Sequence, residues 1–138
     1  SSNNAPMKLI SSYRSYQTQV STYNRWVASS GQAAADTFSA RAGHSEHQLG
    51  LAADLGVQGS SSCDLQTCFG ETAAGNWLAA NAQSYGFVIR YPAGKQSLTG
   101  YQYEPWHIRY VGVEEATAIK SSGLTMDEYY GKPAGDYQ

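Results

Sequence analysis

The sequence contains few charged residues and no long apolar run, and both absences argue against whole classes of protein. Charged residues make up 14% of the 138 positions, and the net charge is -2 at pH 7. Proteins that bind nucleic acid usually carry a basic patch or stripe instead. No apolar stretch approaches the roughly 18–20 residues that span a bilayer, and no signal-peptide pattern opens the chain. We therefore expect neither a nucleic-acid partner nor a transmembrane segment in this chain.

The residues that are abundant indicate an ordered domain. Hydrophobic residues make up 41% of the chain, and there are eleven tyrosines and three tryptophans. This composition is typical of a folded globule rather than a disordered segment. A chain of this length fits one domain with one hydrophobic core, and it contains no repeat or linker. We expect a flexible leader over residues 1–8, a folded domain over residues 9–138, and a monomer.

Cysteine is scarce, and its two copies lie close together, at Cys63 and Cys68. A zinc knuckle would need further soft ligands nearby, and the sequence has none. A local disulfide is the better interpretation, and it would place the protein outside the cytoplasm, in the extracellular space or the cell envelope. Two unpaired thiols in a reducing compartment are the alternative.

Hydrophobic periodicity predicts a mixture of helices and strands. Strands are expected over residues 49–57, 87–91, 101–103 and 106–111, the last two of which could form one strand interrupted by Pro105. Helices are expected over residues 16–31, 32–38, 72–85 and 113–120. Thr125 and Glu128 have the spacing of a capping box, which predicts a last short helix.

Four residues in two short segments form a pattern typical of metal-assisted hydrolysis. They are His47, Asp54, Glu104 and His107. Two imidazoles and one carboxylate can hold a zinc ion and leave one coordination position open for water. The remaining carboxylate, Glu104, lies near His107 in the sequence and could deprotonate that water.

The expected strands give this hypothesis a geometric test, because side chains alternate between the two faces of a strand. If the two strands are antiparallel neighbours, Asp54 and His107 can project towards one point. His47 would arrive from the loop before the first strand. The neighbours of Asp54, which are Leu51, Ala53 and Leu55, should point the other way, into the core.

Each of these residues also has a simpler interpretation. A lone histidine is most often a surface or hydrogen-bonded residue, and an aspartate at a strand end is commonly a turn residue or a helix cap. A glutamate three residues before a histidine is a weak signal by itself. The joint pattern, with small residues at Gly50 and Ala52 that leave room for an ion and a substrate, favours the metal site.

The chain resembles a known family in two motifs, Ser45-x-His47-x-x-Gly50-x-Ala52-x-Asp54 and Glu104-x-x-His107. They are similar to the signature motifs of the zinc D-alanyl-D-alanine carboxypeptidases of the VanY type. These enzymes belong to a wider group with the lysostaphin-like peptidases and the hedgehog signalling domain. Further blocks at residues 12–19, 85–92, 99–112 and 125–130 also resemble the family, in the same order.

The resemblance implies a fold and a metal site. The fold would be a single α+β domain, in which helices flank a small antiparallel sheet that carries the site. His47, Asp54 and His107 would hold one zinc ion, and Glu104 would be the general base. Arg14 would stabilise the anionic intermediate, for which a guanidinium is suited because it can donate two hydrogen bonds. Without the resemblance, Arg14 reads as a surface salt-bridge residue.

The resemblance also implies contacts with a peptide substrate. Gln19 and Ser45 match positions that contact the peptide, although Ser45 could equally orient the His47 loop. Arg41 is a further candidate for the substrate carboxylate, and Trp106 is expected to be a packing wall of the site. The implied reaction removes the terminal D-alanine from the stem peptide of bacterial peptidoglycan, as a D,D- or an L,D-carboxypeptidase. An endopeptidase, a D-Ala-D-Ala dipeptidase and a non-catalytic zinc-binding module are the alternatives.

Two features depart from the family pattern. Only twelve residues precede the block that begins at Tyr13, where family members usually have more chain and a covering helix. The segment between Cys63 and Cys68 corresponds to no fixed family feature. Neither departure touches an expected metal ligand, and both bear on the shape of the substrate pocket.

Overall fold

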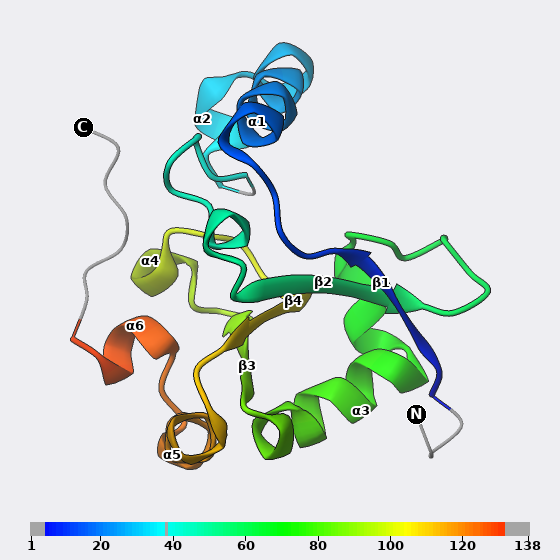
Figure 1. Ribbon diagram of the computed structural model, residues 1–138, viewed down its shortest axis with the longest axis vertical. Coiled ribbons are helices and arrows are strands. Elements are labelled where there is room, and N and C mark those ends of the chain that lie inside the picture. Colours follow the sequence, from blue (N-terminus) through cyan, green and yellow to red (C-terminus); the bar gives the residue numbers. More distant parts are fainter. Residues whose placement is uncertain (1–4, 38, 132–138) are drawn as a thin grey trace.

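A four-stranded antiparallel sheet lies at the centre of the computed structural model, which describes residues 5–37 and 39–131 (Figure 1). The strand order is β1-β2-β4-β3. The strands are β1 (Met7–Ser11), β2 (Ala52–Val57), β3 (Phe87–Tyr91) and β4 (Glu104–Tyr110). The expected α+β fold with a small antiparallel sheet is confirmed.

Helices surround the sheet, and they are α1 (Tyr16–Ser30), α2 (Gln32–Ala35), α3 (Ala73–Asn81), α4 (Gln96–Thr99), α5 (Val113–Ser122) and α6 (Met126–Tyr129). Shorter 3-10 helices are η1 (Glu46–Leu49), η2 (Thr67–Glu71) and η3 (Ala82–Tyr85). Figure 1 shows α1 and α2 together at one end of the molecule, with α3 and α5 at the other. Within the described residues, no helix combines the length and apolar character needed to cross a membrane.

The main hydrophobic core lies between the sheet and α3. Its buried members are Ala5, Phe69, Ala74, Leu78, Ala82, Trp106 and Ile108. Ala53 and Leu55 pack against this core, as expected. A smaller cluster joins β3 to α5 through Val88, Ala116 and Ile119. The face of β2 and β4 that carries Asp54 and His107 is therefore opposite to the main core.

The register of the two central strands confirms the prediction that Asp54 and His107 project towards one point. Asp54 pairs directly with His107 across the antiparallel ladder, and Ala53 pairs with Ile108. Directly opposed residues share a face of the sheet, with their Cβ atoms about 4.5–5.5 Å apart. Asp54 and His107 thus project together, away from the core that contains Ile108.

The first expected strand begins later than predicted. Residues 46–49 form η1, because Ser45 caps its first turn and accepts a hydrogen bond from the backbone of His47. Gly50 ends the turn in the left-handed region, at φ 69°. Leu51 precedes β2 and remains 37% exposed, so its expected place in the core is wrong. The 3-10 helix η1 places His47 beside Asp54 and His107 of the sheet.

The start of the chain also differs from the prediction. Residues 1–4 lie outside the described part, but Ala5 is buried in the core and β1 begins at Met7. Strand β1 pairs with β2 from Met7 to Ser11. The expected flexible leader is therefore wrong for residues 5–8, because they bury apolar side chains and fill the ladder of β2. No local alternation pattern marks so short a strand.

The last expected strands are a single strand, β4, and residues 101–103 precede it. Pro105 is tolerated because β2 pairs only with residues 107–109 and the β3 ladder is irregular between Ile89 and Tyr91. The helix expected over residues 72–85 ends as η3, and the one over residues 32–38 ends at Ala35, with residue 38 outside the described part. The helices after Ser15 and Gly112 are confirmed.

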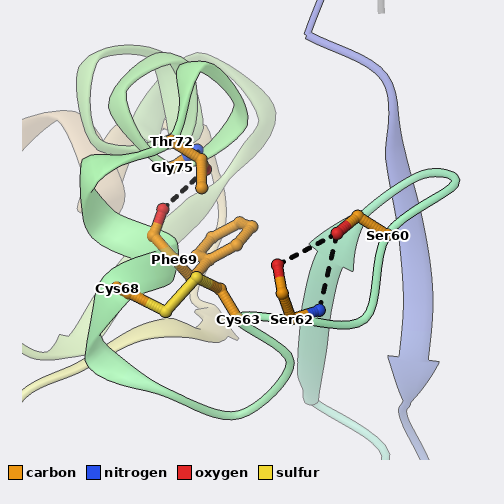
Figure 2. Close-up of a disulfide and its surroundings, with 7 residues drawn as sticks. All are labelled: Ser60, Ser62, Cys63, Cys68, Phe69, Thr72 and Gly75. Carbon is orange, nitrogen blue, oxygen red and sulfur yellow. Dashed lines mark hydrogen bonds between the residues drawn. A yellow bond between two sulfur atoms is a disulfide. The ribbon is translucent and has the colours of Figure 1, made fainter.

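Two local signals in the sequence are confirmed by their bonds. Thr125 and Glu128 form the reciprocal capping box at the start of α6. Cys63 and Cys68 form the expected disulfide, which joins the loop after β2 to η2 (Figure 2). The fully buried ring of Phe69 follows directly and anchors η2 in the core.

Candidate metal centre

Three buried side chains converge at the sheet surface. His47 comes from η1, Asp54 from β2 and His107 from β4, and one ligand atom of each lies within 4.8 Å of the others. The Nε2 atom of His47 is 3.1 Å from Oδ2 of Asp54, and the Nδ1 atom of His107 is 3.3 Å from Oδ1 of Asp54. The three ligands predicted from the sequence are thus brought together.

Hydrogen bonds from outside the cluster orient the His47 ring and the Asp54 carboxylate. The Nδ1 atom of His47 donates to the backbone carbonyl of Ser12 at 2.6 Å, which leaves the lone pair of Nε2 facing Asp54. The hydroxyl of Ser11 donates to Oδ2 of Asp54 at 2.7 Å. Strand β1 and the residue after it therefore orient two of the three ligands.

One buried oxygen of Asp54 tests whether these residues fit a cation. Within the described part of the chain, Oδ1 of Asp54 accepts no hydrogen bond, although it is buried. A buried acceptor without a hydrogen bond is costly unless another group satisfies it. Two imidazoles and a carboxylate with one such oxygen match the donor set of a zinc site with an open position.

Glu46 also belongs to this site, and sequence reasoning missed it. Its Oε2 lies 3.3 Å from Nε2 of His107, on the side of the ring opposite Asp54. Its Oε1 accepts from Arg90 at 2.5 Å and lies 3.0 Å from Arg109. Burial alone would raise the pKa of Glu46, but the hydrogen bond with His107 and the charge of Arg90 outweigh it and lower the pKa to about 2.

Arg90 extends this network to the last helix. Its guanidinium contacts both carboxylate oxygens of Asp127, at 2.5 and 3.1 Å. Asp127 lies in the first turn of α6 and is buried. Such two-bond pairs fix geometry as well as charge. A chain of contacts thus runs from His107 through Glu46 and Arg90 to α6. The only signal for it in the sequence was the position of Glu46 next to a ligand.

Glu104 occupies the position expected of the base. It is buried at the start of β4, and its Oε2 lies 3.4 Å from Nδ1 of His107. Burial raises the pKa of the Glu104 carboxyl to about 8; the charges of Asp54 and Glu46 act in the same direction. A carboxyl group whose pKa lies near neutral can both accept and donate a proton in a reaction.

A cavity of about 390 Å³ opens over these groups. Its walls include the three ligands and Glu104, together with Arg14, Gln19 and Ser45. The volume falls within the range of about 300–1,000 Å³ that is typical of small-molecule sites. The cavity therefore has room for part of a substrate beside the ligands.

Arg14 reaches the cavity from the segment between β1 and α1. Its Nη1 donates to Oε1 of Gln19 at 2.8 Å, and its Nη2 lies 3.9 Å from Oδ2 of Asp54. Gln19 is itself buried and donates to the backbone carbonyl of Ala40. Both ends of the Gln19 amide are thus engaged, and its visible role is to hold Arg14.

The remaining candidates divide between the site and its surroundings. Ser45 lines the cavity, but its hydroxyl caps η1, which is the orienting role weighed above. Arg41 pairs with Asp36 through two hydrogen bonds and does not line the cavity. Trp106 is buried in the main core and forms part of the cavity wall, as expected.

Comparison with known proteins identifies the family of this chain. The family model described as VanY, D-alanyl-D-alanine carboxypeptidase, matches residues 1–113. YodJ of Bacillus subtilis, which is named as a carboxypeptidase, is 45% identical over 123 residues. These residues are 89% of this chain but 45% of YodJ, so the chain spans less than half the length of that relative.

Solved structures share the fold at similar identity. An L,D-carboxypeptidase, DacB from Streptococcus pneumoniae, is 47% identical with a TM-score of 0.84; the match covers 99% of this chain and 71% of that one. The D,D-pentapeptidase VanY of a VanB-type resistance cassette, solved with Zn(II), is 37% identical with a TM-score of 0.81, over 94% and 74% of the two chains. The chain belongs to the VanY family of D-alanyl-D-alanine carboxypeptidases.

Proposed function

We propose that this chain is a zinc-dependent carboxypeptidase that hydrolyses the terminal D-alanine from peptidoglycan stem peptides. The observation that carries the proposal is the convergence of His47, Asp54 and His107 beside Glu104, in one cavity. The family supplies the substrate class, because its members are named for the D-alanyl-D-alanine bond. The bond cleaved is a D,D-bond in a pentapeptide or an L,D-bond in a tetrapeptide.

In this proposal His47, Asp54 and His107 hold one zinc ion. The solved VanY structure, which contains Zn(II), supports the choice of metal. When bound, zinc polarises an amide carbonyl and lowers the pKa of a water molecule. Glu104 takes the proton from the attacking water at its carboxylate and passes it to the leaving amine of D-alanine. Both transfers require a carboxylate beside the metal ligands, and Oε2 of Glu104 lies 3.4 Å from Nδ1 of His107.

Arg14 supplies the positive charge for the developing oxyanion. Its guanidinium lies in the cavity wall and is held by Gln19 and Ser11. Charged donors that are already oriented stabilise a transition state without the cost of reorganising solvent. Arg14 is therefore the second catalytic residue in this proposal, and Gln19 is its positioning residue.

Defined muropeptides test the proposal. The zinc-loaded protein is incubated with a tetrapeptide and a pentapeptide, and the products are measured by mass spectrometry. Loss of a single D-alanine from either peptide supports a carboxypeptidase and identifies the bond. Release of D-alanyl-D-alanine would identify a dipeptidase instead, and cleavage within a cross-link would identify an endopeptidase. Absence of any product from zinc-loaded protein would favour a non-catalytic binding module.

We further propose that the protein acts outside the cytoplasm, in the extracellular space or the cell envelope. The Cys63–Cys68 disulfide supports this location, because such bonds persist in oxidising compartments. The substrate class supports it as well, since peptidoglycan lies outside the cell membrane. The enzyme acts as a monomer in this proposal, because one chain supplies every ligand, the base and the cavity wall.

A further inference from the structure

The loop closed by the Cys63–Cys68 disulfide reaches the catalytic cavity, although none of its residues takes part in the proposed chemistry. Leu65, in the middle of this loop, lines the same cavity as His47 and Glu104. Its side chain is 44% exposed. A large apolar side chain thus faces solvent at the wall of the cavity that contains the expected metal ligands and Glu104.

The backbone of Leu65 adopts an unfavourable conformation. It is the one non-glycine residue in the described part of the chain with a positive φ, at 55°. The backbone of Gln66 donates to the carbonyl of Cys63 at 3.2 Å, so Leu65 is the third residue of a tight turn. Glycine or asparagine is favoured at that position when φ is positive. Leucine is therefore held there by its surroundings, and such outliers cluster at functional sites.

Contacts on both sides of Leu65 hold the loop in place. Before it, the carboxylate of Asp64 pairs with Lys8 of β1 at 2.7 Å. Asp64 also lies directly over Gly56 of β2, where a side chain would collide with it. After it, the disulfide ties Cys63 to the start of η2, and the buried ring of Phe69 fixes η2 in the core (Figure 2).

We infer that Leu65 is a specificity-determining residue that contacts the aliphatic side chain of the residue before the terminal D-alanine. This inference rests on the proposed function. Leu65 and Trp26 of α1 both line the cavity, and within the described residues they are its two exposed large apolar side chains. The side chain of the terminal D-alanine is a single methyl group. Two large apolar side chains in the cavity wall therefore suit a longer side chain in the substrate. A tetrapeptide with a diamino acid before its D-alanine supplies one.

Two peptides test the inference. They share one sequence, end in D-alanine and differ only in the preceding residue, which is lysine in one and alanine in the other. Their dissociation constants are measured by calorimetry in zinc-loaded Glu104→Ala protein, with and without Leu65→Gly. Glycine suits the positive φ, so this variant removes the side chain without straining the turn. We expect Leu65→Gly to weaken binding of the lysine peptide about fivefold and to leave the alanine peptide unchanged.

Two further variants separate binding from folding. Leu98→Ala removes an exposed leucine outside the cavity and should leave both dissociation constants unchanged. The double variant Cys63→Ser, Cys68→Ser should selectively weaken binding of the lysine peptide, because the loop that carries Leu65 is then no longer held by the disulfide. Thermal unfolding of Leu65→Gly should occur at or above the wild-type temperature. Unchanged binding in Leu65→Gly, or equal weakening of both peptides, would overturn the inference.

The same experiment distinguishes this inference from the proposed function. Hydrolysis is measured separately in protein with Glu104 intact. Protein with Glu104 intact could release no D-alanine while Leu65→Gly still weakens binding of the lysine peptide. In that case the proposed function is wrong and the role of Leu65 in binding stands. If D-alanine is released and the preference for lysine over alanine is the same in wild type and Leu65→Gly, the role of Leu65 is wrong.

Discussion

The two ring nitrogens of His107 face two different carboxylates: Nδ1 lies 3.3 Å from Asp54 and Nε2 lies 3.3 Å from Glu46. A carboxylate can only accept, so the hydrogen bond to Glu46 keeps a proton on Nε2 and leaves Nδ1 facing the other ligands. His47 has the reverse arrangement, with Nδ1 bound to Ser12 and Nε2 facing Asp54. The partners behind each ring therefore decide which nitrogen can bind a metal.

Glu46→Gln should weaken zinc binding while the three ligands remain. The amide is neutral, so it orients His107 less strongly and leaves Arg90 with Asp127 as its one remaining charged partner among the contacts described above. Changes behind a ligand typically cost 10–100-fold in affinity, and we expect a loss of about that size. Competition with a coloured chelator measures it, and Glu114→Gln on the exposed face of α5 is the matched control. Equal zinc affinity in both variants would contradict the role given to Glu46.

Glu104→Ala should keep zinc and lose hydrolysis. The side chain lies beside the ligands without being one of them, so its removal leaves the metal-binding atoms in place. The lost proton transfer should reduce kcat by at least about 10²–10⁴-fold. Metal content by mass spectrometry and release of D-alanine are measured on the same sample. A variant that remained fully active would show that another group is the base.

Gly75→Ala should destabilise the protein, although alanine favours helices. Within a helix the exchange usually stabilises by about 1 kcal/mol. At this position, in the first turn of α3, the added Cβ would collide with the backbone carbonyl of Phe69. We expect a net loss of about 1–3 kcal/mol in the free energy of unfolding, measured by urea denaturation. Ala80→Gly, on the exposed side of α3, calibrates the helix propensity itself.

Glu128 should make the stability of α6 depend on pH. The backbone hydrogen bond from Thr125 lowers the pKa of Glu128, and the ion pair with Lys95 acts in the same direction. A lowered pKa means that the charged form stabilises the fold above the unfolded value of about 4.3, and that this stability is lost as the pH falls through the lower folded value.

The comparison with Glu128→Gln isolates this charge, because glutamine keeps an oxygen for the cap. Wild type should unfold at a higher temperature than the variant at about pH 7, and the difference should shrink and then vanish as the pH falls below the unfolded value of about 4.3 and through the lower folded value. Thermal unfolding followed by circular dichroism measures both. A difference that persists at low pH would mean that size or shape, rather than charge, stabilises the cap.

Several features of this molecule could be predicted from the sequence, because they depend on residues that lie close together along the chain or within one strand. The spacing of His47, Asp54, Glu104 and His107 predicted that these side chains lie together, because strand alternation places residues on known faces. The cap at Thr125 predicted a helix start, because its hydroxyl accepts a hydrogen bond from the backbone of Glu128, three residues away. The short distance between Cys63 and Cys68 along the chain favoured their pairing. Each of these signals lies within a few residues of the structure that it predicts.

Contacts between distant segments required the tertiary structure. Glu46 meets Arg90 and His107 only after η1 folds over the sheet, and β1 becomes a strand only because β2 lies beside it. Arg41 was a candidate from the sequence for contact with the substrate carboxylate, but in the structure it pairs with Asp36, five residues away. Sequence spacing thus determined which groups could bind a metal. Long-range packing decided which nitrogens face it, and it placed Leu65 at the wall of the cavity, because such contacts depend on segments that meet only in the folded chain.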